Sequence, residues 1–418
     1  MFEFNQTQKM AEKMMRGYVE KEILPHVAAM DRGDMLPYDL FRKMHKELGL
    51  RIAAEKAINK AIARKRAEEA GEAPEEKPEK ENAKGDEDDL SGGQDPLLMA
   101  ILMKELSRVS PGFTLSYGAS LGLCGSNIQK KGTAEQLEKY AKPVLLYDKI
   151  GCWGLTEPDA GSDAFGSMKT VARRDGDYYV LNGSKTFITN APHADIFVIY
   201  ARLDKGQGGE KNTWPVKSFI CVREDEGLST SEPMDKMGMR DSPTGLIYLE
   251  DCRIPVDRIL GTEEEESRGD GKEVLQGERS GMPAMALGII ERCLEVATKY
   301  AKEREQFGQP IANYQAVQLR LAEMYIAYEN CRNLVFKQAW LQREGKRDMF
   351  SAQVAKVYCT QQATKVALDA IQILGGNGYM KEYYVEKLMR DAKLLEIGGG
   401  TSDINMMGMM REYLARSS

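Results

Sequence analysis

The chain has 418 residues, more than one hydrophobic core normally organises, so we expect two or three domains. Hydrophobic residues make up 42% of the chain, which is typical of a globular protein. The formal net charge of -6 argues against general affinity for nucleic acid, because such affinity requires a basic surface.

The cysteines and histidines favour neither disulfides nor a metal site. Seven cysteines are scattered without a Cys-x-x-Cys pair, which is a poor disulfide framework and favours the reducing cytoplasm. We interpret the only histidines, His26, His45 and His193, as structural or surface residues, and we predict no metal. The first 25 residues are charged throughout, so we expect neither a signal peptide nor a membrane span.

The first 50 residues are predicted to be helical, with a stop at Pro25. A charged insertion follows at about 53–95, nearly without bulky apolar residues after Ile62. We expect its first half to be a solvated helix and its second half a disordered type of linker. The alternative is a segment that docks a partner or covers the substrate. Helices resume at "DPLLMAILMKELSRV".

Strand patterns begin near residue 150. The stretch "DGDYYVLNGSKTFIT" predicts two strands joined by an Asn-Gly turn, and three further β-rich runs follow it. From about 270 the pattern is helical again, and one helix face is expected to carry Val317, Leu321, Met324, Tyr328, Cys331 and Val335. We therefore predict an α+β protein with an N-terminal helical domain (1–148), a middle β domain (149–265) and a C-terminal four-helix bundle (266–418).

Five motifs stand out in this order. "CWGLTEPDAGSDAFG" (152–166) offers hydroxyls and free backbone N–H groups, which suit a flat polar ring or a phosphate, although alone it could be only an elaborate loop. It is followed by "KMGMRDSPTGLIYLEDCRIP", "YAKEREQFGQPIANYQAVQ", "IQILGGNGYMKEY" and "MRDAKLLEIGGGTSDIN". Together the motifs resemble those of acyl-CoA dehydrogenases, and the resemblance covers everything except the insertion.

The resemblance implies an FAD-binding homotetramer with the flavin between the β domain and the helical bundle. One group of matched positions would line the flavin ring: Trp153, Leu155, Thr156, Ser162, Phe187 and Thr189. The family more often has Trp where Phe187 stands. A second group would contact the FAD of a neighbouring subunit or its nucleotide part: Arg304, Gln306, Phe307, Gln372, Gly376, Thr401 and Asp403.

The usual catalytic base of the family is absent. Members commonly carry a Tyr-Glu-Gly-Thr segment whose carboxylate removes the α-proton, and here Gly399 takes the carboxylate position. Isovaleryl- and long-chain-type members supply the base from the start of the bundle. A gapless count back from "ATKYAKEREQFG" matches that position to Glu278, followed by Arg279. Glu278 could instead be only a favourable acid in a first helical turn, and Glu396 is the rival base.

The resemblance implies dehydrogenation of an acyl-CoA. Glu278 would take the α-proton, flavin N5 the β-hydride, and an electron-transferring flavoprotein the electrons. Arg279 would lie near the CoA arm, and Ser162 and Gly399 would border the acyl thioester. The space at Gly399 favours branched, cyclic or aryl-bearing substrates such as benzylsuccinyl-CoA or cyclohexanecarboxyl-CoA. The alternatives are decarboxylation or C–S cleavage on the same fold, against which Glu278 argues, and a non-catalytic CoA-binding scaffold, which bound flavin would nearly exclude.

Overall fold

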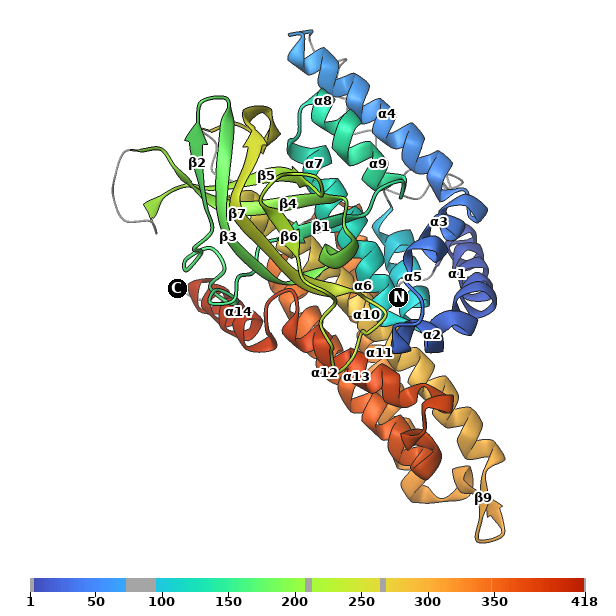
Figure 1. The fold of residues 1–418 in the computed structure, drawn as a ribbon. Helices are drawn as coiled ribbons and strands as arrows, with labels where there is room; N and C mark the ends of the chain where they lie inside the picture. Colours follow the sequence, from blue (N-terminus) through green and yellow to red (C-terminus); the bar gives the residue numbers. More distant parts are fainter. Residues whose placement is uncertain (1–3, 73–94, 207–212, 264–267, 347, 417–418) are drawn as a thin grey trace.

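The computed structural model describes residues 4–72, 95–206, 213–263, 268–346 and 348–416, without the side chains of 268–280 and 416. A helical region, a β region and a long helical bundle follow one another along the chain (Figure 1). The elements change from helices to strands between Leu145 and Gly151, and back to helices between Leu260 and Arg268. These changes support domain limits at 148/149 and 265/266, which stay a prediction.

The N-terminal region consists of short helices with local start and stop signals. Asn5 caps the first helix, and its side chain accepts from the backbone N–H of Gln8 at 2.8 Å. The helix continues as a π-helical segment, Val19–Ile23, and then as a 3-10 turn at Leu24–His26, because Pro25 lacks a backbone N–H. The helices are α1 Gln6–Tyr18, α2 Val27–Arg32, α3 Tyr38–Glu47, α4 Leu50–Glu69, α5 Pro96–Ser107, α6 Pro111–Gly118, α7 Ser126–Lys131, α8 Ala134–Gln136 and α9 Lys142–Leu145.

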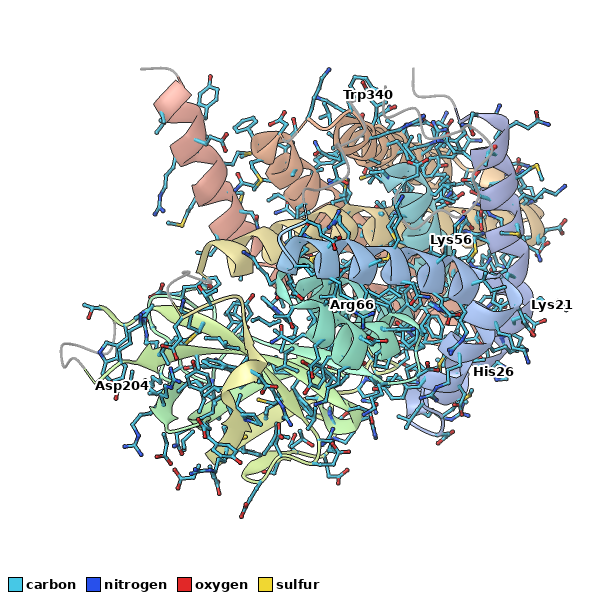
Figure 2. All side chains as sticks on the ribbon, turned by 90° about the horizontal axis from the view of Figure 1, so that it is seen from above. Lys21, His26, Lys56, Arg66, Asp204 and Trp340 are labelled. Atoms are coloured by element: carbon cyan, nitrogen blue, oxygen red, sulfur yellow. The ribbon has the colours of Figure 1, made fainter. Side chains whose placement is uncertain are left out.

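Helix α4 corrects the prediction of a solvated first half for the insertion. The helix exists, but Ile58 and Ile62 are buried in a cluster that reaches the β region. Glu69 also accepts a hydrogen bond from the backbone N–H of Ala134 at 2.9 Å. The opposite face, with Lys56, is exposed, whereas Arg66, four residues after Ile62, pairs with Glu138 (Figure 2). Two isoleucines four residues apart were a sufficient signal for this packed face. The predicted second half of the insertion lies largely outside the described residues.

The β region is a sheet with the strand order β6-β7-β3-β2-β4-β5-β8, in which β1 also pairs with β4. Its buried face holds the apolar side chains of β3, β4, β5 and β7. The strands are β1 Gly151–Gly154, β2 Val171–Asp175, β3 Tyr178–Thr189, β4 Ile196–Asp204, β5 Val216–Val222, β6 Leu228–Thr230, β7 Thr244–Pro255 and β8 Ile259–Leu260.

The predicted Asn-Gly turn is wrong. Asn182 and Gly183 lie within β3, where the pairing with β7 shifts register. The chain instead turns at Gly176, whose φ of 59° suits glycine. A side chain at position 183 would place its Cβ 2.6 Å from the Thr170 hydroxyl, so this glycine permits close approach of two backbones. The dipeptide signal thus marks a bulge.

The C-terminal region is a bundle of α10, α11, α12 and α13, with α5 of the first region packed against it (Figure 1). The predicted face of α11 is confirmed: Met324, Cys331 and Val335 are buried, and Val317, Leu321 and Tyr328 pack against them. None of the helices in the described residues is long and apolar enough to cross a membrane. The elements are α10 Arg268–Glu303, β9 Glu305–Gln306, β10 Gln309–Pro310, α11 Gln315–Arg343, α12 Met349–Leu374, α13 Val385–Ile397 and α14 Ser402–Arg416.

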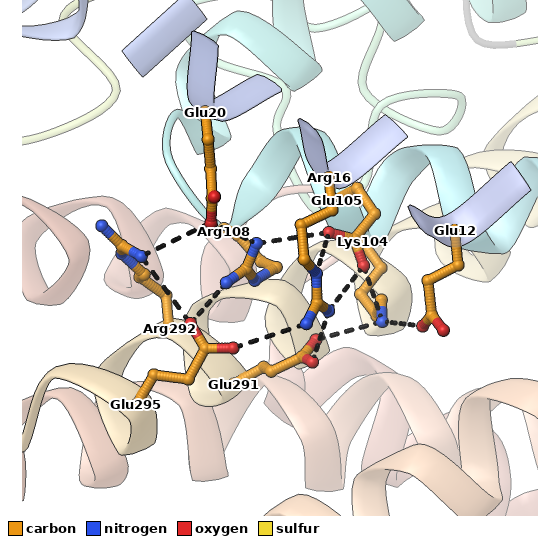
Figure 3. Close-up of polar contacts among 9 residues, drawn as sticks. All are labelled: Glu12, Arg16, Glu20, Lys104, Glu105, Arg108, Glu291, Arg292 and Glu295. Atoms are coloured by element: carbon orange, nitrogen blue, oxygen red, sulfur yellow. Dashed lines mark hydrogen bonds and ion pairs between the residues drawn. The ribbon is translucent and has the colours of Figure 1, made fainter. Parts of the chain in front are cut away.

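A cluster of charged side chains joins α1 and α5 to α10 (Figure 3). At its centre the fully buried carboxylate of Glu105 lies 2.9 Å from Arg16, 2.8 Å from Lys104 and 3.3 Å from Arg108. On the α10 side, Glu291 approaches Arg16 at 2.6 Å. We call this group the α1–α5–α10 charge cluster; its members are Glu12, Arg16, Glu20, Lys104, Glu105, Arg108, Glu291, Arg292 and Glu295.

His45 should make the stability of the protein fall in acid. The ring is buried, its Nε2 lies 2.8 Å from the Tyr117 hydroxyl, and burial lowers its pKa to about 4. In the unfolded chain the pKa is about 6.5, so between these values only the unfolded state binds the proton. Stability therefore falls as the pH falls from 6.5 to 4, and we expect a loss of about 2–3 kcal/mol between pH 7 and pH 4.5 from this group.

The measurement is urea unfolding at both pH values for the wild type and for His45→Phe. The phenylalanine variant has no proton to gain at this position, so its stability should change less between the two pH values. Parallel pH dependence in the two proteins would contradict the prediction.

Candidate active site

The first motif and strand β3 come together at the end of β1. The backbone N–H of Thr186 donates to the carbonyl of Thr156 at 2.9 Å. Trp153 and Leu155 are buried in the packing between the sheet and the N-terminal helices, whereas Ser162 is exposed. The indole N–H of Trp153 is buried and has no acceptor among the described residues, so a bound group could satisfy it. The segment thus combines packed anchors with an exposed polar turn.

Phe187 presents its ring to the surface in an unusual backbone conformation. Its side chain is 69% exposed and its φ is 57°, a value that bulky residues rarely adopt. The β3–β7 pairing is irregular between Lys185 and Ile188, and regular pairing resumes at Ile188. Such strain persists where the surroundings impose it, and it gathers at functional sites. An uncovered aromatic ring beside two threonines fits the face and edge of a flavin ring.

The three glycines form a tightly held loop between α13 and α14. Gly399 and Gly400 have φ values of 60° and 87°, which disfavour other residues. The buried ammonium group of Lys356 donates to the Gly400 carbonyl at 2.8 Å, and the Asn405 amide donates to the same oxygen at 2.8 Å. The Thr401 hydroxyl accepts from the backbone N–H of Ile404 at 3.2 Å. Thr401 therefore also serves as a helix cap.

The glycine loop lies against α10, the helix that contains Glu278. A Cβ on Gly398 would come 3.1 Å from the terminal methyl group of Met282. Glu278 precedes Met282 by four residues, about one turn, in the same helix. The side chains of Glu278 and Arg279 lie outside the described side chains.

Glu396 has other partners. Its carboxylate accepts from the Thr364 hydroxyl at 2.6 Å and pairs with Lys393 at 3.0 Å. Both partners belong to the packing of α12 and α13. The Glu396 carboxylate is thus bonded to one side chain of α12 and one of α13.

The predicted cofactor residues of the C-terminal bundle fall into two places. Thr401 and the exposed Asp403 border the glycine loop. Arg304, Gln306 and Phe307 instead lie at the β9–β10 hairpin, at the end of the bundle away from the sheet (Figure 1). Phe307 is 96% exposed, with a φ of 52°.

Gln372 and Gly376 belong to the hairpin end as well. Asn377, which follows Gly376, donates to the Tyr300 hydroxyl at 2.9 Å, and Tyr300 is near the end of α10 that leads into the hairpin. One chain therefore does not bring the hairpin residues to the Phe187 surface.

Three residues of this area were missed in the sequence. Lys185 and Glu157 form a buried ion pair at 2.7 Å directly behind the first motif. Lys356 holds the glycine loop. The signal for Lys185 was a charged residue within the apolar strand "YYVLNGSKTFIT". No comparable local signal identified the contact partners, because Glu157 lies 28 residues from Lys185 and Gly400 lies 44 residues from Lys356.

No group of three or more His, Cys, Asp or Glu side chains suited to a metal occurs in the described part of the chain. All seven cysteines are free and buried. The site therefore offers aromatic surface, hydroxyls and backbone donors, which are the means of binding a flat, polar-edged ring.

Family models match three consecutive parts of the chain: the acyl-CoA dehydrogenase N-terminal domain at 86–146, the middle domain at 152–252 and the C-terminal domain at 271–414. A 3-(aryl)acrylate reductase of Clostridium sporogenes is 35% identical to this chain, in an alignment that covers 97% of each protein. A mitochondrial isovaleryl-CoA dehydrogenase of Arabidopsis thaliana is 40% identical over 76% of each chain. The butyryl-CoA dehydrogenase structure from Megasphaera elsdenii has a TM-score of 0.80 at 33% identity, covering 99% of this chain and 100% of that one.

The three-region fold, with its sheet between two helical parts, is that of a flavin-dependent oxidoreductase. The chain belongs to the acyl-CoA dehydrogenase family. It is an FAD-dependent enzyme, and the FAD would be held by the residues around Thr156 and Phe187.

Proposed function

We propose that the protein oxidises the α,β bond of a branched, cyclic or aryl-bearing acyl-CoA, with Glu278 as the base. The observation that carries this proposal is the glycine loop. Gly399, at the usual position of the base, has a φ of 60° that favours glycine, and the neighbouring Gly398 packs against α10 one turn from Glu278. We infer that Glu278 on α10, the helix against which the loop packs, replaces the carboxylate that is missing at Gly399.

The residues of the chain divide the work. FAD, when bound, supplies the acceptor for the hydride from the β-carbon. Glu278 takes the α-proton, which requires a carboxylate near the thioester in a site with little water. Thr156 and Thr189 offer hydroxyls to the ring edge, and Phe187 offers its exposed ring face. Arg279 lies beside the base in sequence and is a suitable partner for the CoA arm.

The absence of side chains from the glycine loop supports a wide acyl group. Neither Gly398, Gly399 nor Gly400 places a side chain beside α10. Among the relatives, one acts on an aryl acrylate and one on isovaleryl-CoA, as their names state. Benzylsuccinyl-CoA and cyclohexanecarboxyl-CoA are two candidate thioesters of this class.

A panel of acyl-CoA thioesters, mixed anaerobically with the purified protein, tests this function. Absorbance near the flavin bands should fall with a branched, cyclic or aryl thioester and less with butyryl-CoA. Bleaching by straight-chain thioesters alone would contradict the substrate class. Decarboxylated or thiol products would favour the alternative chemistries on this fold, and protein purified without flavin would favour a scaffold.

We also propose that the enzyme is a homotetramer, because one chain separates the hairpin residues from the Phe187 surface. Large apolar side chains are exposed in the bundle, which a subunit interface would cover: Phe307, Leu319, Tyr325, Ile326, Leu368 and Tyr379. Sedimentation should give four times the chain mass of 46.8 kDa.

The sharing of sites between subunits has a test of its own. Arg304→Ala and Phe187→Ala should each lower the FAD content of the protein. Their co-expression should restore part of it, because mixed tetramers contain some sites with both residues intact. A monomer, or no restoration, would contradict the proposal.

An electron-transferring flavoprotein is the proposed acceptor, because the reduced flavin must pass on two electrons. The seven free cysteines support a reducing compartment, and we propose the cytoplasm.

A further inference from the structure

Lys185 is a fully buried cation directly behind the loop proposed to face the flavin. Its ammonium group donates to the carbonyl of Leu155 at 3.2 Å and to the carboxylate of Glu157 at 2.7 Å. Its stem passes over Gly154, where a Cβ would come 3.3 Å from its Cγ. The absence of a side chain at Gly154 therefore gives the lysine its route to the loop.

Glu157 balances this charge and is itself held firmly. Its carboxylate accepts from the backbone N–H groups of Lys169 at 2.6 Å and Thr170 at 3.0 Å, and from the Thr170 hydroxyl at 2.5 Å. Burial raises the pKa of Glu157, but the charge of Lys185 and these hydrogen bonds outweigh it, and the pKa is lowered. The lysine is thus bonded to a fixed anion on one side and to the Leu155 carbonyl on the other.

The Leu155 carbonyl belongs to the peptide that leads into Thr156. The carbonyl of Thr156 in turn accepts from the backbone N–H of Thr186. The Leu155 carbonyl is therefore bonded to the side chain of Lys185, and the Thr156 carbonyl is bonded to the backbone of Thr186, the residue after Lys185. Phe187 follows immediately and is exposed. Among these contacts, Lys185 is the only charged side chain of β3 that bonds to the loop.

We propose that Lys185 is a positioning residue for the flavin: bonded to Leu155 and balanced by Glu157, it holds the Leu155–Thr156 peptide in the orientation that contacts the ring. The proposal rests on the flavin placement proposed above. A purely structural role is a weaker account, because a buried ion pair seldom stabilises a fold more than apolar residues of the same volume. The hydrogen bond from Lys185 to the Leu155 carbonyl instead fixes the orientation of the peptide that is proposed to lie at the edge of the flavin ring.

The experiment compares three variants of the holoenzyme with the wild type. Lys185→Met with Glu157→Gln removes both charges together, so no buried charge is left alone. Glu157→Gln keeps a donor at position 185, since even a neutral amine can donate to the Leu155 carbonyl. Lys217→Met is the matched control, because Lys217 is also a buried strand lysine that donates to a loop carbonyl, that of Thr262 at 3.0 Å, on β5 rather than β3.

The readouts are the dissociation constant of FAD, the visible absorption and circular dichroism of the bound flavin, and the urea midpoint. The double variant should keep a midpoint near that of the wild type, bind FAD about 10-fold more weakly and show altered flavin bands, because a hydrogen bond from a charged donor contributes about this much. Glu157→Gln should stay closer to the wild type in both flavin readouts. Lys217→Met should change the midpoint without changing the flavin bands.

Unchanged FAD affinity and flavin bands in the double variant would overturn the proposal. If that variant fails to fold, Lys185→Gln with Glu157→Gln replaces it, and failure of both to fold would assign the pair a structural role instead. Wild-type protein that binds FAD but is not reduced by any acyl-CoA would contradict the proposed function and leave the role of Lys185 untouched.

Discussion

Glu278→Gln should slow anaerobic reduction of the flavin by acyl-CoA by roughly 10²–10⁴-fold, the usual contribution of a positioned general base. Glutamine keeps the shape and the hydrogen-bonding capacity of the side chain but cannot take the α-proton. Binding of the thioester, seen as a perturbation of the flavin spectrum, should therefore remain. Stopped-flow measurement of flavin bleaching separates the two effects.

Glu396→Gln is the matched control, because it makes the same change on α13, a helix that packs against α10. The carboxylate of Glu396 is held by Thr364 and Lys393, so its loss should slow reduction far less. Unimpaired reduction in Glu278→Gln would sink the assignment, and a large loss in Glu396→Gln alone would transfer the role to the rival.

Moving the base back to the loop should rescue only weakly. In Glu278→Gly with Gly399→Glu, the new side chain stands at a φ of 60°, a left-handed conformation that costs about 1–2 kcal/mol for a residue with a Cβ. A carboxylate displaced by about an ångström also loses much of its efficiency. Any recovered activity should favour slim, straight-chain thioesters, because a glutamate at position 399 takes up volume that a glycine does not.

Glu105→Gln should destabilise the protein by about 3–5 kcal/mol, the usual cost of removing one partner from a buried ion pair. Glu105 is fully buried and faces Arg16, Lys104 and Arg108 within the α1–α5–α10 charge cluster (Figure 3). Without its charge, three partly or fully buried cations lose their common anion. The urea midpoint of unfolding, followed by circular dichroism, measures the effect.

The control for Glu105 is Glu323→Gln. Glu323 pairs with Lys365 at 2.9 Å, but both side chains are more than half exposed, so water and salt screen the pair. Its midpoint should stay at the wild-type value. Equal midpoints for both variants would mean that the neighbouring acids, above all Glu291, compensate for Glu105.

The sequence by itself determined the order of the helical and β regions. Helical spacing identified the buried face of α11 from Met324, Cys331 and Val335, because apolar periodicity is a local property of the chain. The same local reading showed a glycine at position 399 where the family usually has a carboxylate, and a glutamate at 278. It also identified the family to which the domain models assign the chain.

The tertiary structure decided what depends on residues distant in sequence. Asn182 and Gly183 have a turn signature but form a bulge, because β7 pairs along the whole of β3 and Thr170 approaches Gly183. Ile58 and Ile62 are buried because the helical segment from α8 to α9, with Leu137 and Val144, packs against α4. Contacts across tens of residues leave no periodic trace in a sequence. For the same reason only the folded chain showed that Lys185 bonds to Leu155 and Glu157. It also showed that Phe307, in the β9–β10 hairpin, lies apart from the Phe187 surface, although both residues are proposed to contact FAD.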